Sequence, residues 1–215
     1  MKLISYKQNG NIKLGAFEEG KIYDLHALDG HIADNMLEFL QGGEEQLQLA
    51  MAAMEDGSPT ISAEDVELIS PVPNPPSVRD AYAFRQHVAT ARRNRGLEMI
   101  PEFDEIPIFY FTNHHAVFGE GYFPVLSRHT EKLDFELECA AVIGKGGRNI
   151  STSDADDYIA GFMIMNDLSA RVLQMQEMKL NLGPAKGKDF GSTFGPWLVT
   201  KDELEPYKQS SADGD

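Results

Sequence analysis

Asp134-Phe135-Glu136-Leu137-Glu138 is the stretch that decides how this sequence is interpreted. It opens a segment, residues 135–143, whose pattern predicts a strand. Because side chains at positions i and i+2 of a strand share one face, Glu136 and Glu138 are expected to project together. Two carboxylates this close repel each other unless protons or a cation lie between them. The stretch therefore predicts a divalent-metal site on one strand face, opposite an apolar face made by Phe135, Leu137 and Cys139.

A third carboxylate supports the metal interpretation. Residues 158–165 are apolar and predict a second strand, which ends directly at Asn166-Asp167. Carboxylate oxygens select hard cations such as Mg²⁺, Mn²⁺ or Ca²⁺. The alternative is ordinary, because an isolated Glu-x-Glu pair is more often the solvated face of a half-exposed strand. Both interpretations stay open at this point.

The composition bounds the class of protein. The 215 residues carry a net charge of −15, which argues against a binder of nucleic acid or of anionic membranes. Cys139 is the single cysteine, so an intrachain disulfide is excluded and a reducing compartment is favoured. Residues 1–10 lack the apolar run of a signal peptide, and no segment reaches the length of a membrane span. We therefore expect a cytoplasmic protein.

The first third of the chain predicts a small β-rich domain, residues 1–70. Asn9-Gly10 and Glu19-Gly20 are hairpin signals, so residues 2–24 are expected to form short strands joined by tight turns. Residues 33–55 carry apolar side chains at helical spacing, and a pair of glycines divides this predicted helix into two pieces.

A proline-rich linker, residues 71–77, separates that domain from a predicted core, residues 78–204. Ser77 is expected to cap a helix that runs to about Asn94, with Gly96 as its terminator. Residues 205–215 are polar and are expected to form a disordered tail.

Asp80 and His87 form the second candidate group. They are seven residues apart, so on one continuous helix they would share a face. An aspartate and a histidine so placed suit a metal ligand and a general base. The alternative for a single histidine is a packed or solvated imidazole, which is the more common case.

The third candidate group is basic. Gly183-x-x-x-Gly187-Lys188 is one residue short of a phosphate-binding loop, and Asp189 replaces the required hydroxyl residue, so that motif is rejected. A lysine beside a glycine turn can still meet a substrate carboxylate. Arg92, Arg93 and Arg95 lie at the end of a predicted helix, where they either complement its dipole or hold an anionic substrate.

Four segments occur in an order that resembles the fumarylacetoacetate hydrolase family. They are Arg85-Gln86-His87, Leu133-Asp134-Phe135-Glu136-Leu137-Glu138, Tyr158-Ile159-Ala160-Gly161 leading to Asn166-Asp167-Leu168-Ser169-Ala170-Arg171, and Lys186-Gly187-Lys188-Asp189-Phe190 leading to Gly195-Pro196-Trp197-Leu198. Each segment alone is weak, but the four in order are specific.

The resemblance implies a fold that is α+β but mostly β. The family has a mixed β-sheet roll or barrel core, here behind the small N-terminal β-rich domain. Because the family fold continues with further strands after Gly195-Pro196-Trp197, we expect the core to be incomplete at its C-terminus. Family members usually associate through exposed β surface, so the resemblance also implies a homodimer.

The resemblance further implies a site for Mg²⁺, or for Mn²⁺ or Ca²⁺. The positions that match the family's metal ligands are Asp80, Glu136, Glu138 and Asp167. His87 matches the water-activating base of the hydrolase branch, and Lys188 matches a lysine that contacts substrate and takes part in catalysis. The other positions that match substrate contacts are Tyr82, Arg95, Tyr110 and Gln174.

The activity implied is hydrolysis of a C–C bond in a small anionic β-diketo acid, such as fumarylacetoacetate or an acylpyruvate. The reaction would pass through an enolate stabilised by the metal and by Lys188. Met178 stands where hydrolases can carry a tyrosine, and no counterpart is found for the glutamate that orients the histidine. One alternative is decarboxylation, isomerisation or hydration of a 2-oxo acid. The other is a truncated chain that binds metal or subunits without turnover.

Overall fold

The computed structural model describes residues 1–209, and its first strands follow the predicted hairpins. They are β1 (Lys2–Gln8), β2 (Asn11–Glu18) and β3 (Lys21–Asp24), which pair antiparallel in chain order. Asn9 and Glu19, with φ of 52° and 46°, adopt the left-handed conformation that such tight hairpin turns require. The prediction of short strands in residues 2–24 is confirmed.

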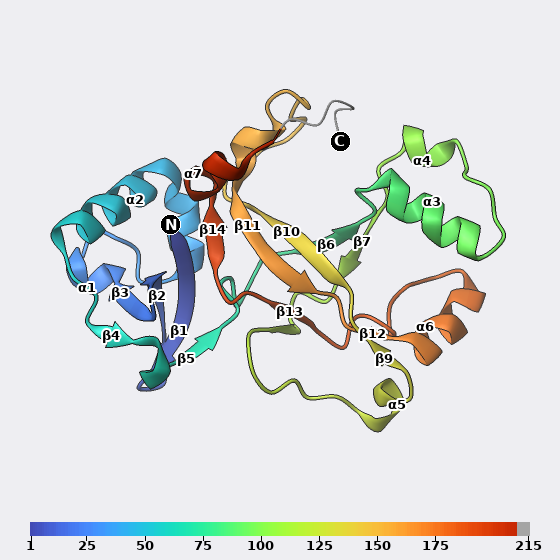
Figure 1. The fold of residues 1–215 in the computed structure, drawn as a ribbon, viewed down its shortest axis with the longest axis horizontal. Coiled ribbons are helices and arrows are strands. Elements are labelled where there is room, and N and C mark those ends of the chain that lie inside the picture. Colours follow the sequence, from blue (N-terminus) through green and yellow to red (C-terminus); the bar gives the residue numbers. More distant parts are fainter. Residues whose placement is uncertain (210–215) are drawn as a thin grey trace.

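Two helices cover one side of these strands (Figure 1). They are α1 (Leu25–Leu28) and α2 (Met36–Asp56). Gly43, with φ of 59° and ψ of −137°, interrupts α2, as the paired glycines predicted. Met36, Phe39, Leu40 and Ala50 of α2 are buried in one hydrophobic cluster with β-strand residues, and this cluster is the larger core of the chain.

One curled ten-stranded sheet runs through the molecule (Figure 1). Its main path follows the order β4-β3-β2-β1-β14-β11-β13-β8, while β10 pairs with β11 and β5 pairs with β1. The further strands are β4 (Ile61–Ser62), β5 (Glu67–Ile69), β8 (Val117–Phe118), β10 (Leu137–Ile143), β11 (Ile159–Asn166), β13 (Ser192–Phe194) and β14 (Leu198–Thr200). The result is a mixed α/β fold with a strongly curled sheet.

Strand β14 joins the N-terminal strands to the rest of the sheet. Leu3 of β1 pairs with Leu198 of β14, and Val199 pairs with Phe162 of β11. Gly161 permits the close approach of β11 to β14, because a Cβ there would lie 2.2 Å from the Val199 carbonyl oxygen. The division into a domain of residues 1–70 and a core of residues 78–204 stays a prediction.

Leu198→Ala is expected to lower the free energy of unfolding by about 2–5 kcal/mol, because it opens a cavity where the side chain is fully buried. Leu182, which is 86% exposed, offers a matched control of the same chemistry, and Leu182→Ala should change stability little. Urea unfolding of the two variants checks the difference. Equal losses would show that β14 is not the packed junction described.

The predicted helix from Ser77 to Asn94 is wrong in its first half. Residues Val78–Ala81 form strand β6, which pairs antiparallel with β7 (Phe109–Thr112) in a separate two-stranded sheet. Helix α3 (Arg85–Asn94) begins only afterwards, and Gly96, with φ of 70°, follows its end. Pairing with a distant aromatic strand overrides the local helical pattern. Asp80 and His87 therefore lie on different elements and not on one helix face.

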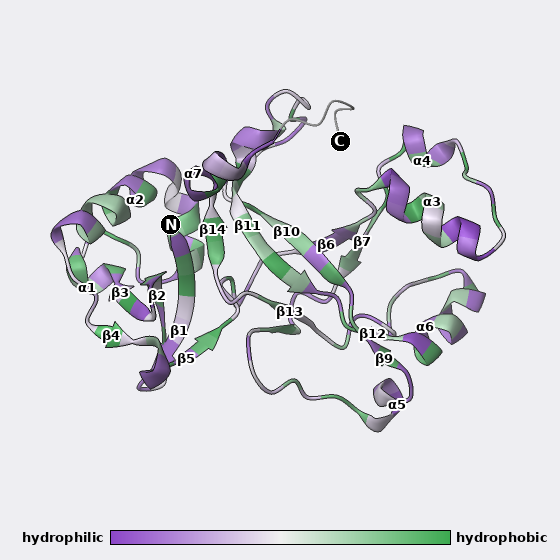
Figure 2. Cartoon of the chain, in the orientation of Figure 1, coloured by the Kyte–Doolittle hydropathy of each residue, from purple (hydrophilic) through white to green (hydrophobic). Residues whose placement is uncertain are grey.

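The strand predicted over residues 135–143 begins later than expected. A short strand, β9 (Leu133–Asp134), pairs with β12 (Ser169–Ala170), and the chain then changes sheet before β10 starts at Leu137. Glu136 thus lies at the break, not within the strand. Alternate residues of β10 are exposed, including Leu137 and Cys139, whose thiol is free. Figure 2 colours much of β10 as hydrophobic.

Short helices complete the described chain. They are η1 (Ala63–Asp65), α4 (Glu102–Glu105), α5 (Ser127–Thr130), η2 (Ala155–Tyr158), α6 (Arg171–Glu177), η3 (Met178–Leu180), α7 (Lys201–Leu204) and η4 (Glu205–Tyr207). Of the predicted polar tail, residues 205–207 form the last turn, and residues 210–215 lie outside the described part.

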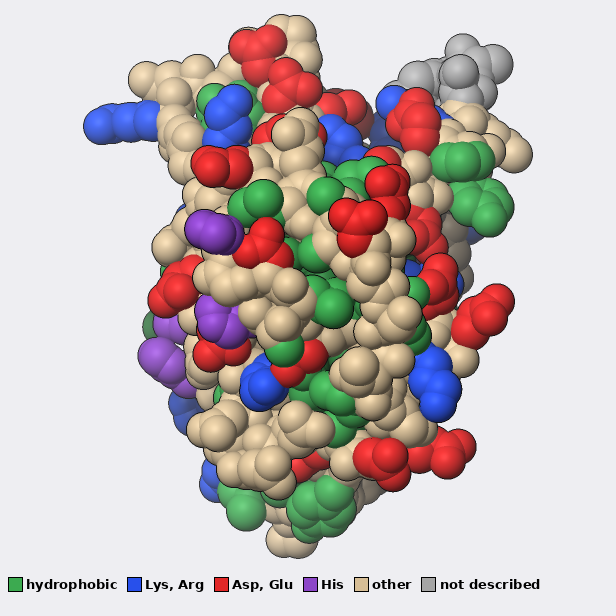
Figure 3. Space-filling model, turned by 90° about the vertical axis from the view of Figure 1, so that its left-hand side faces the viewer, with side chains coloured by type: hydrophobic (Ala, Val, Ile, Leu, Met, Phe, Trp, Pro, Cys, Tyr) green, Lys and Arg blue, Asp and Glu red, His purple; other side chains and the backbone are tan. Residues whose placement is uncertain are grey.

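The hydropathy of the helices and the charge of the surface match what the composition indicates. Within residues 1–209, no helix combines the length and the hydropathy that crossing a membrane requires. Acidic side chains outnumber basic ones on the face that Figure 3 presents.

Candidate metal centre

Three carboxylates, carried by two strands and by the residue after a third strand, converge on one point. Asp80 comes from β6, Glu138 from β10, and Asp167 directly follows β11. One oxygen atom from each of the three lies within 4.8 Å of the others. Asp167 is fully buried, and the other two are half-buried. This cluster, Asp80, Glu138 and Asp167, is called the acidic triad below.

Backbone pairing brings the triad together. Asp80 is the register partner of Tyr110 on β7, so both side chains project from the same face of the two-stranded sheet. Glu138 pairs with Met165 near the end of β11. The Asp167 N–H donates to the Glu136 carbonyl oxygen at 3.0 Å, which holds the residue after β11 beside the start of β10.

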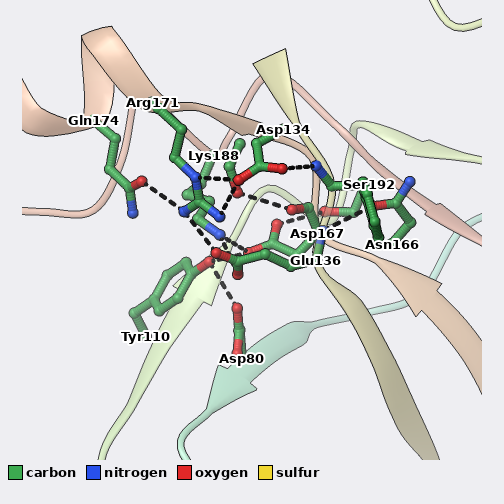
Figure 4. Close-up of polar contacts among 12 residues, drawn as sticks. Asp80, Tyr110, Asp134, Glu136, Asn166, Asp167, Arg171, Gln174, Lys188 and Ser192 are labelled. Atoms are coloured by element: carbon green, nitrogen blue, oxygen red, sulfur yellow. Dashed lines mark hydrogen bonds and ion pairs between the residues drawn. The ribbon is translucent and has the colours of Figure 1, made fainter. Parts of the chain in front are cut away.

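Lys188 places a positive charge inside this acidic centre (Figure 4). Its side chain is only 3% exposed, and its Nζ donates to Asp167 Oδ2 at 2.6 Å and to Glu136 Oε2 at 2.7 Å. Burial opposes the charged form, but the hydrogen bonds and charges of Asp167 and Glu136 prevail and raise the pKa of Lys188. The amine is therefore an ammonium group at neutral pH.

Glu136 is held by two cations. Besides Lys188, Arg171 Nη1 lies 2.6 Å from Glu136 Oε1. Burial disfavours the carboxylate, yet Lys188 and Arg171 outweigh it and lower the pKa of Glu136. Since each carboxylate oxygen has two lone pairs, Glu136 can keep these contacts and still offer an oxygen to a cation beside the triad.

Arg171 and Asp134 were not predicted to take part in the site. Arg171 donates through Nε to Asp134 Oδ2 at 2.9 Å and through Nη1 to Gln174 Oε1 at 3.1 Å (Figure 4). Arg171 thereby links Asp134, Glu136 and Gln174. The sequence places Arg171 four residues after Asp167, inside one of the four ordered segments, and this could have marked it as a site residue. The neighbouring sequence does not indicate which residues Arg171 contacts.

The triad carries more negative charge than its neighbours neutralise. Burial and the charges of Asp80, Asp167 and Glu136 raise the pKa of Glu138 to about 7. Burial, only partly offset by Lys188, raises the pKa of Asp167 to about 6. Tyr110 Oη lies 2.9 Å from Asp80 and 3.0 Å from Asp167, but its single proton satisfies only one of them fully.

An oxygen-only donor set with excess negative charge fits a hard divalent cation. Carboxyl groups with raised pKa values bind protons more readily than usual, and a dication can take the place of those protons. Asp80, Glu138 and Asp167 would hold the ion, with Glu136 as a further oxygen donor, as the sequence predicted for all four. These ligand assignments are proposals that rest on the convergence described.

Mn²⁺ binding is expected to weaken as the pH falls. Both pKa values, about 7 for Glu138 and about 6 for Asp167, are raised, so protons compete with the cation below pH 7. The dissociation constant should rise about tenfold or more between about pH 8 and about pH 6. Calorimetric titration at both values measures this. A dissociation constant that does not change with pH would contradict the assignment of Glu138.

The stability of the cation-free protein should fall as the pH rises, whereas its affinity for Mn²⁺ should increase. A carboxyl group whose folded-state pKa is raised favours the folded state when protonated, and this contribution is lost as the pH rises through the raised value. The cation-free protein is therefore expected to melt at lower temperature at about pH 8 than at about pH 6, with saturating Mn²⁺ removing the difference. Thermal unfolding with and without chelator checks it.

The predicted substrate and catalytic residues fall into two groups. Tyr110, Gln174 and Lys188 lie in the polar network around the acidic triad (Figure 4). His87 belongs to α3, and Arg95 directly follows the end of that helix, which stands to the side of the sheet (Figure 1). His87 is exposed, and its ring centroid lies 6.4 Å from that of Tyr82, which is also exposed.

Within residues 1–209, no hydrogen bond or ion pair joins His87, Tyr82 or Arg95 to the triad. The structure thus brings together the predicted metal ligands and Lys188 but leaves the predicted base apart from them. Their roles in catalysis and substrate binding stay predictions.

Comparison with known proteins identifies the family of this chain. A family model described as Fumarylacetoacetate (FAA) hydrolase C-terminal matches residues 77–212. The chain is 29% identical over 209 residues to an oxaloacetate tautomerase, fahd2, mitochondrial, of Xenopus laevis, covering 95% of this chain and 63% of that protein. It is 52% identical over 81 residues to a fumarylacetoacetase of Arabidopsis thaliana, covering 36% of this chain and 19% of that protein. The chain thus spans less than two thirds of these curated relatives.

Solved structures share the fold. A fumarylacetoacetate hydrolase from psychrophilic Exiguobacterium antarcticum superposes with a TM-score of 0.67 at 26% identity, covering 96% of this chain and 69% of that one. A maleylpyruvate hydrolase from Sphingobium sp. SYK-6, in complex with manganese(II) ion and pyruvate, gives a TM-score of 0.67 at 22% identity, covering 95% and 69%. Because the family model matches more than half of the chain, this protein belongs to the fumarylacetoacetate hydrolase family.

Proposed function

We propose that the chain carries a divalent-cation-dependent active site that converts a small 2-oxo acid into its enolate. The observation that carries the proposal is the Lys188 ammonium group 2.6 Å from Asp167 and beside the acidic triad. A cation site and a fixed ammonium group at one point suit a reaction in which negative charge develops on a substrate oxygen. A bound Mg²⁺ or Mn²⁺ would polarise the 2-oxo group as a Lewis acid.

The chain's own residues supply the remaining interactions. Lys188 Nζ holds its proton and can donate it as a hydrogen bond to the oxygen that becomes the enolate oxygen. Burial of Lys188 excludes water and strengthens that contact. Arg171, which already fixes Glu136, also orients the Gln174 side chain, a predicted substrate contact.

Keto–enol tautomerisation is the reaction that this arrangement supports best. It moves one proton from carbon to oxygen, with solvent water as the carrier of that proton, and it needs no hydroxide nucleophile. The predicted water-activating base, His87, is exposed on α3 and has no polar contact with the triad among the described residues. The relative that covers 95% of the chain is named as an oxaloacetate tautomerase, which supports a four-carbon oxo acid as substrate.

C–C bond hydrolysis, predicted first from the sequence, is the second candidate. In that reaction His87 would take a proton from water, hydroxide would add to a carbonyl carbon, and the C–C bond would break to release an enolate. The similarity to a fumarylacetoacetase, 52% over 81 residues, favours it. Hydrolysis requires His87 to approach the acidic triad, and for that helix α3 would have to move.

Proton NMR of two mixtures separates the candidates. With Mg²⁺-loaded protein and oxaloacetate, a tautomerase should speed keto–enol exchange without forming a new compound, whereas decarboxylation would yield pyruvate. With acetylpyruvate, a hydrolase should yield acetate and pyruvate. Acceleration should disappear in Asp167→Asn and on chelation. A wild-type protein that accelerates neither reaction above that variant would overturn the proposal.

A further inference from the structure

The last residue of α6, Glu177, has a buried carboxylate that the proposed reaction does not use. Its side chain belongs to a residue that is 9% exposed. The two oxygens accept hydrogen bonds from backbone N–H groups of the loop that precedes Lys188: Oε1 from Ala185, and Oε2 from Gly187 at 2.7 Å. A buried carboxylate satisfied by two loop amides holds that loop firmly.

The same loop lies against the backbone of α6. A Cβ placed on Gly187 would lie 2.6 Å from Gln174 Cβ and 2.8 Å from the Gln174 backbone nitrogen, so only glycine permits this contact. The Gly187 carbonyl oxygen also accepts from the Ala170 N–H at 2.9 Å. The loop is therefore fastened to both α6 and β12 directly before Lys188.

Lys188 depends on this fastening for its position. Its N–H donates to the Ala185 carbonyl oxygen at 2.8 Å, and its Nζ is the group that reaches Asp167 and Glu136. Lys188 is 3% exposed, so its ammonium group has few alternative partners in the protein or in water. A shift of the loop would therefore separate the ammonium group from its carboxylates.

We infer that Glu177 is a positioning residue, which holds residues 185–187 so that the Lys188 ammonium stays against the acidic triad. The catalytic part of this inference rests on the proposed function, whereas the placement of Lys188 does not. Glu177 acts through the loop and has no contact with the reacting atoms. In Glu177→Gln one oxygen becomes an NH₂ group, which meets a backbone N–H donor to donor and breaks that hydrogen bond.

Lysine acetylation followed by mass spectrometry tests the placement without any substrate. Lys186, exposed and two residues away, is the internal reference for the buried Lys188. Glu177→Gln is expected to raise the ratio of Lys188 to Lys186 labelling about tenfold or more, since a loosened loop exposes the amine. The matched control is Gln176→Ala, on the exposed side of the same helix, which should leave the ratio at the wild-type value.

Kinetics test the catalytic part on the Mn²⁺-loaded enzyme with oxaloacetate. Glu177→Gln is expected to lower kcat about 10- to 100-fold with little change in KM, because the displaced ammonium is needed most in the transition state. Glu177→Asp, which keeps both oxygens, should recover part of kcat. If Glu177→Gln fails to fold, Glu177→Asp carries both measurements, with smaller changes in the same direction.

The outcomes distinguish the two proposals. An unchanged labelling ratio in the folded variants would overturn the inference about Glu177, whatever the enzyme does. A raised ratio with unchanged kcat would overturn the catalytic part alone. A wild-type protein with no activity, together with a raised ratio in Glu177→Gln, would refute the proposed function and support the placement of Lys188 by Glu177.

Discussion

Asp167→Asn is expected to abolish high-affinity Mn²⁺ binding and with it the proposed activity. Asp167 is the fully buried member of the acidic triad and the partner of Lys188 at 2.6 Å. An amide carries no charge, so the site loses a ligand while the buried ammonium loses its closest counter-ion. We expect the dissociation constant to rise about 100-fold or more and the rate to fall about 1,000-fold.

The same variant should also lose stability in the cation-free form. Removing one partner of a buried ion pair typically costs about 3–5 kcal/mol, because the remaining charge stays buried without compensation. Asp157→Asn provides the matched control, since that carboxylate is exposed and lies in η2, at the opposite end of β11 from Asp167. Calorimetry for Mn²⁺ and urea unfolding measure the two effects. Retained Mn²⁺ affinity in Asp167→Asn would contradict its role as a ligand.

Lys188→Met is expected to separate metal binding from turnover. The change removes the ammonium while keeping an unbranched side chain in the buried position. Because Lys188 is the proposed donor to the developing enolate oxygen, we expect kcat to fall about 100- to 1,000-fold. Mn²⁺ binding should persist or tighten, because Lys188 no longer competes for Asp167 and Glu136.

Stability adds a second readout for this variant. Without Lys188, the four carboxylates of Glu136 and the acidic triad repel one another, so cation-free Lys188→Met should unfold at lower temperature, and Mn²⁺ should restore most of the loss. Lys186→Met is the control, because its side chain is exposed two residues away. If Lys188→Met lost Mn²⁺ binding and activity together, Lys188 would be supporting the site's structure and not the reaction.

The parts of the fold that depend on neighbouring residues could be predicted from the sequence. The hairpins at Asn9-Gly10 and Glu19-Gly20 and the break in α2 at Gly43 follow from backbone conformations that few residues adopt. The strand that ends at Asn166 follows from a run of apolar residues. In each case the information lies within a few residues of the element.

The missed features depend on contacts across long stretches of chain. Strand β6 exists because Val78 to Ala81 pairs with residues about thirty positions later, and no local pattern around Asp80 indicates that partner. Arg171 and Asp134 are 37 residues apart, and Lys188 and Glu136 are 52 residues apart. The ordered segments identified most of the site residues, but not which of them contact one another.

Glu136 illustrates the difference between sequence spacing and geometry. A strand through residues 135–143 would give Glu136 and Glu138 equal roles on one face. Because the chain changes sheet between β9 and β10, Glu136 turns towards Arg171 and Lys188, while Glu138 joins the acidic triad. Two glutamates that look equivalent in sequence thus differ in pKa, which is lowered for Glu136 and raised for Glu138.

Anomalous X-ray diffraction from crystals grown with Mn²⁺ would locate the bound cation. We expect one strong manganese peak within coordination distance, about 2.0–2.6 Å, of oxygen atoms from Asp80, Glu138 and Asp167, with Lys188 Nζ still beside Asp167. Glu136 should contribute an oxygen or remain hydrogen-bonded next to the ion. A fully occupied peak elsewhere, or none at the triad at saturating Mn²⁺, would show that the acidic triad is not the metal site.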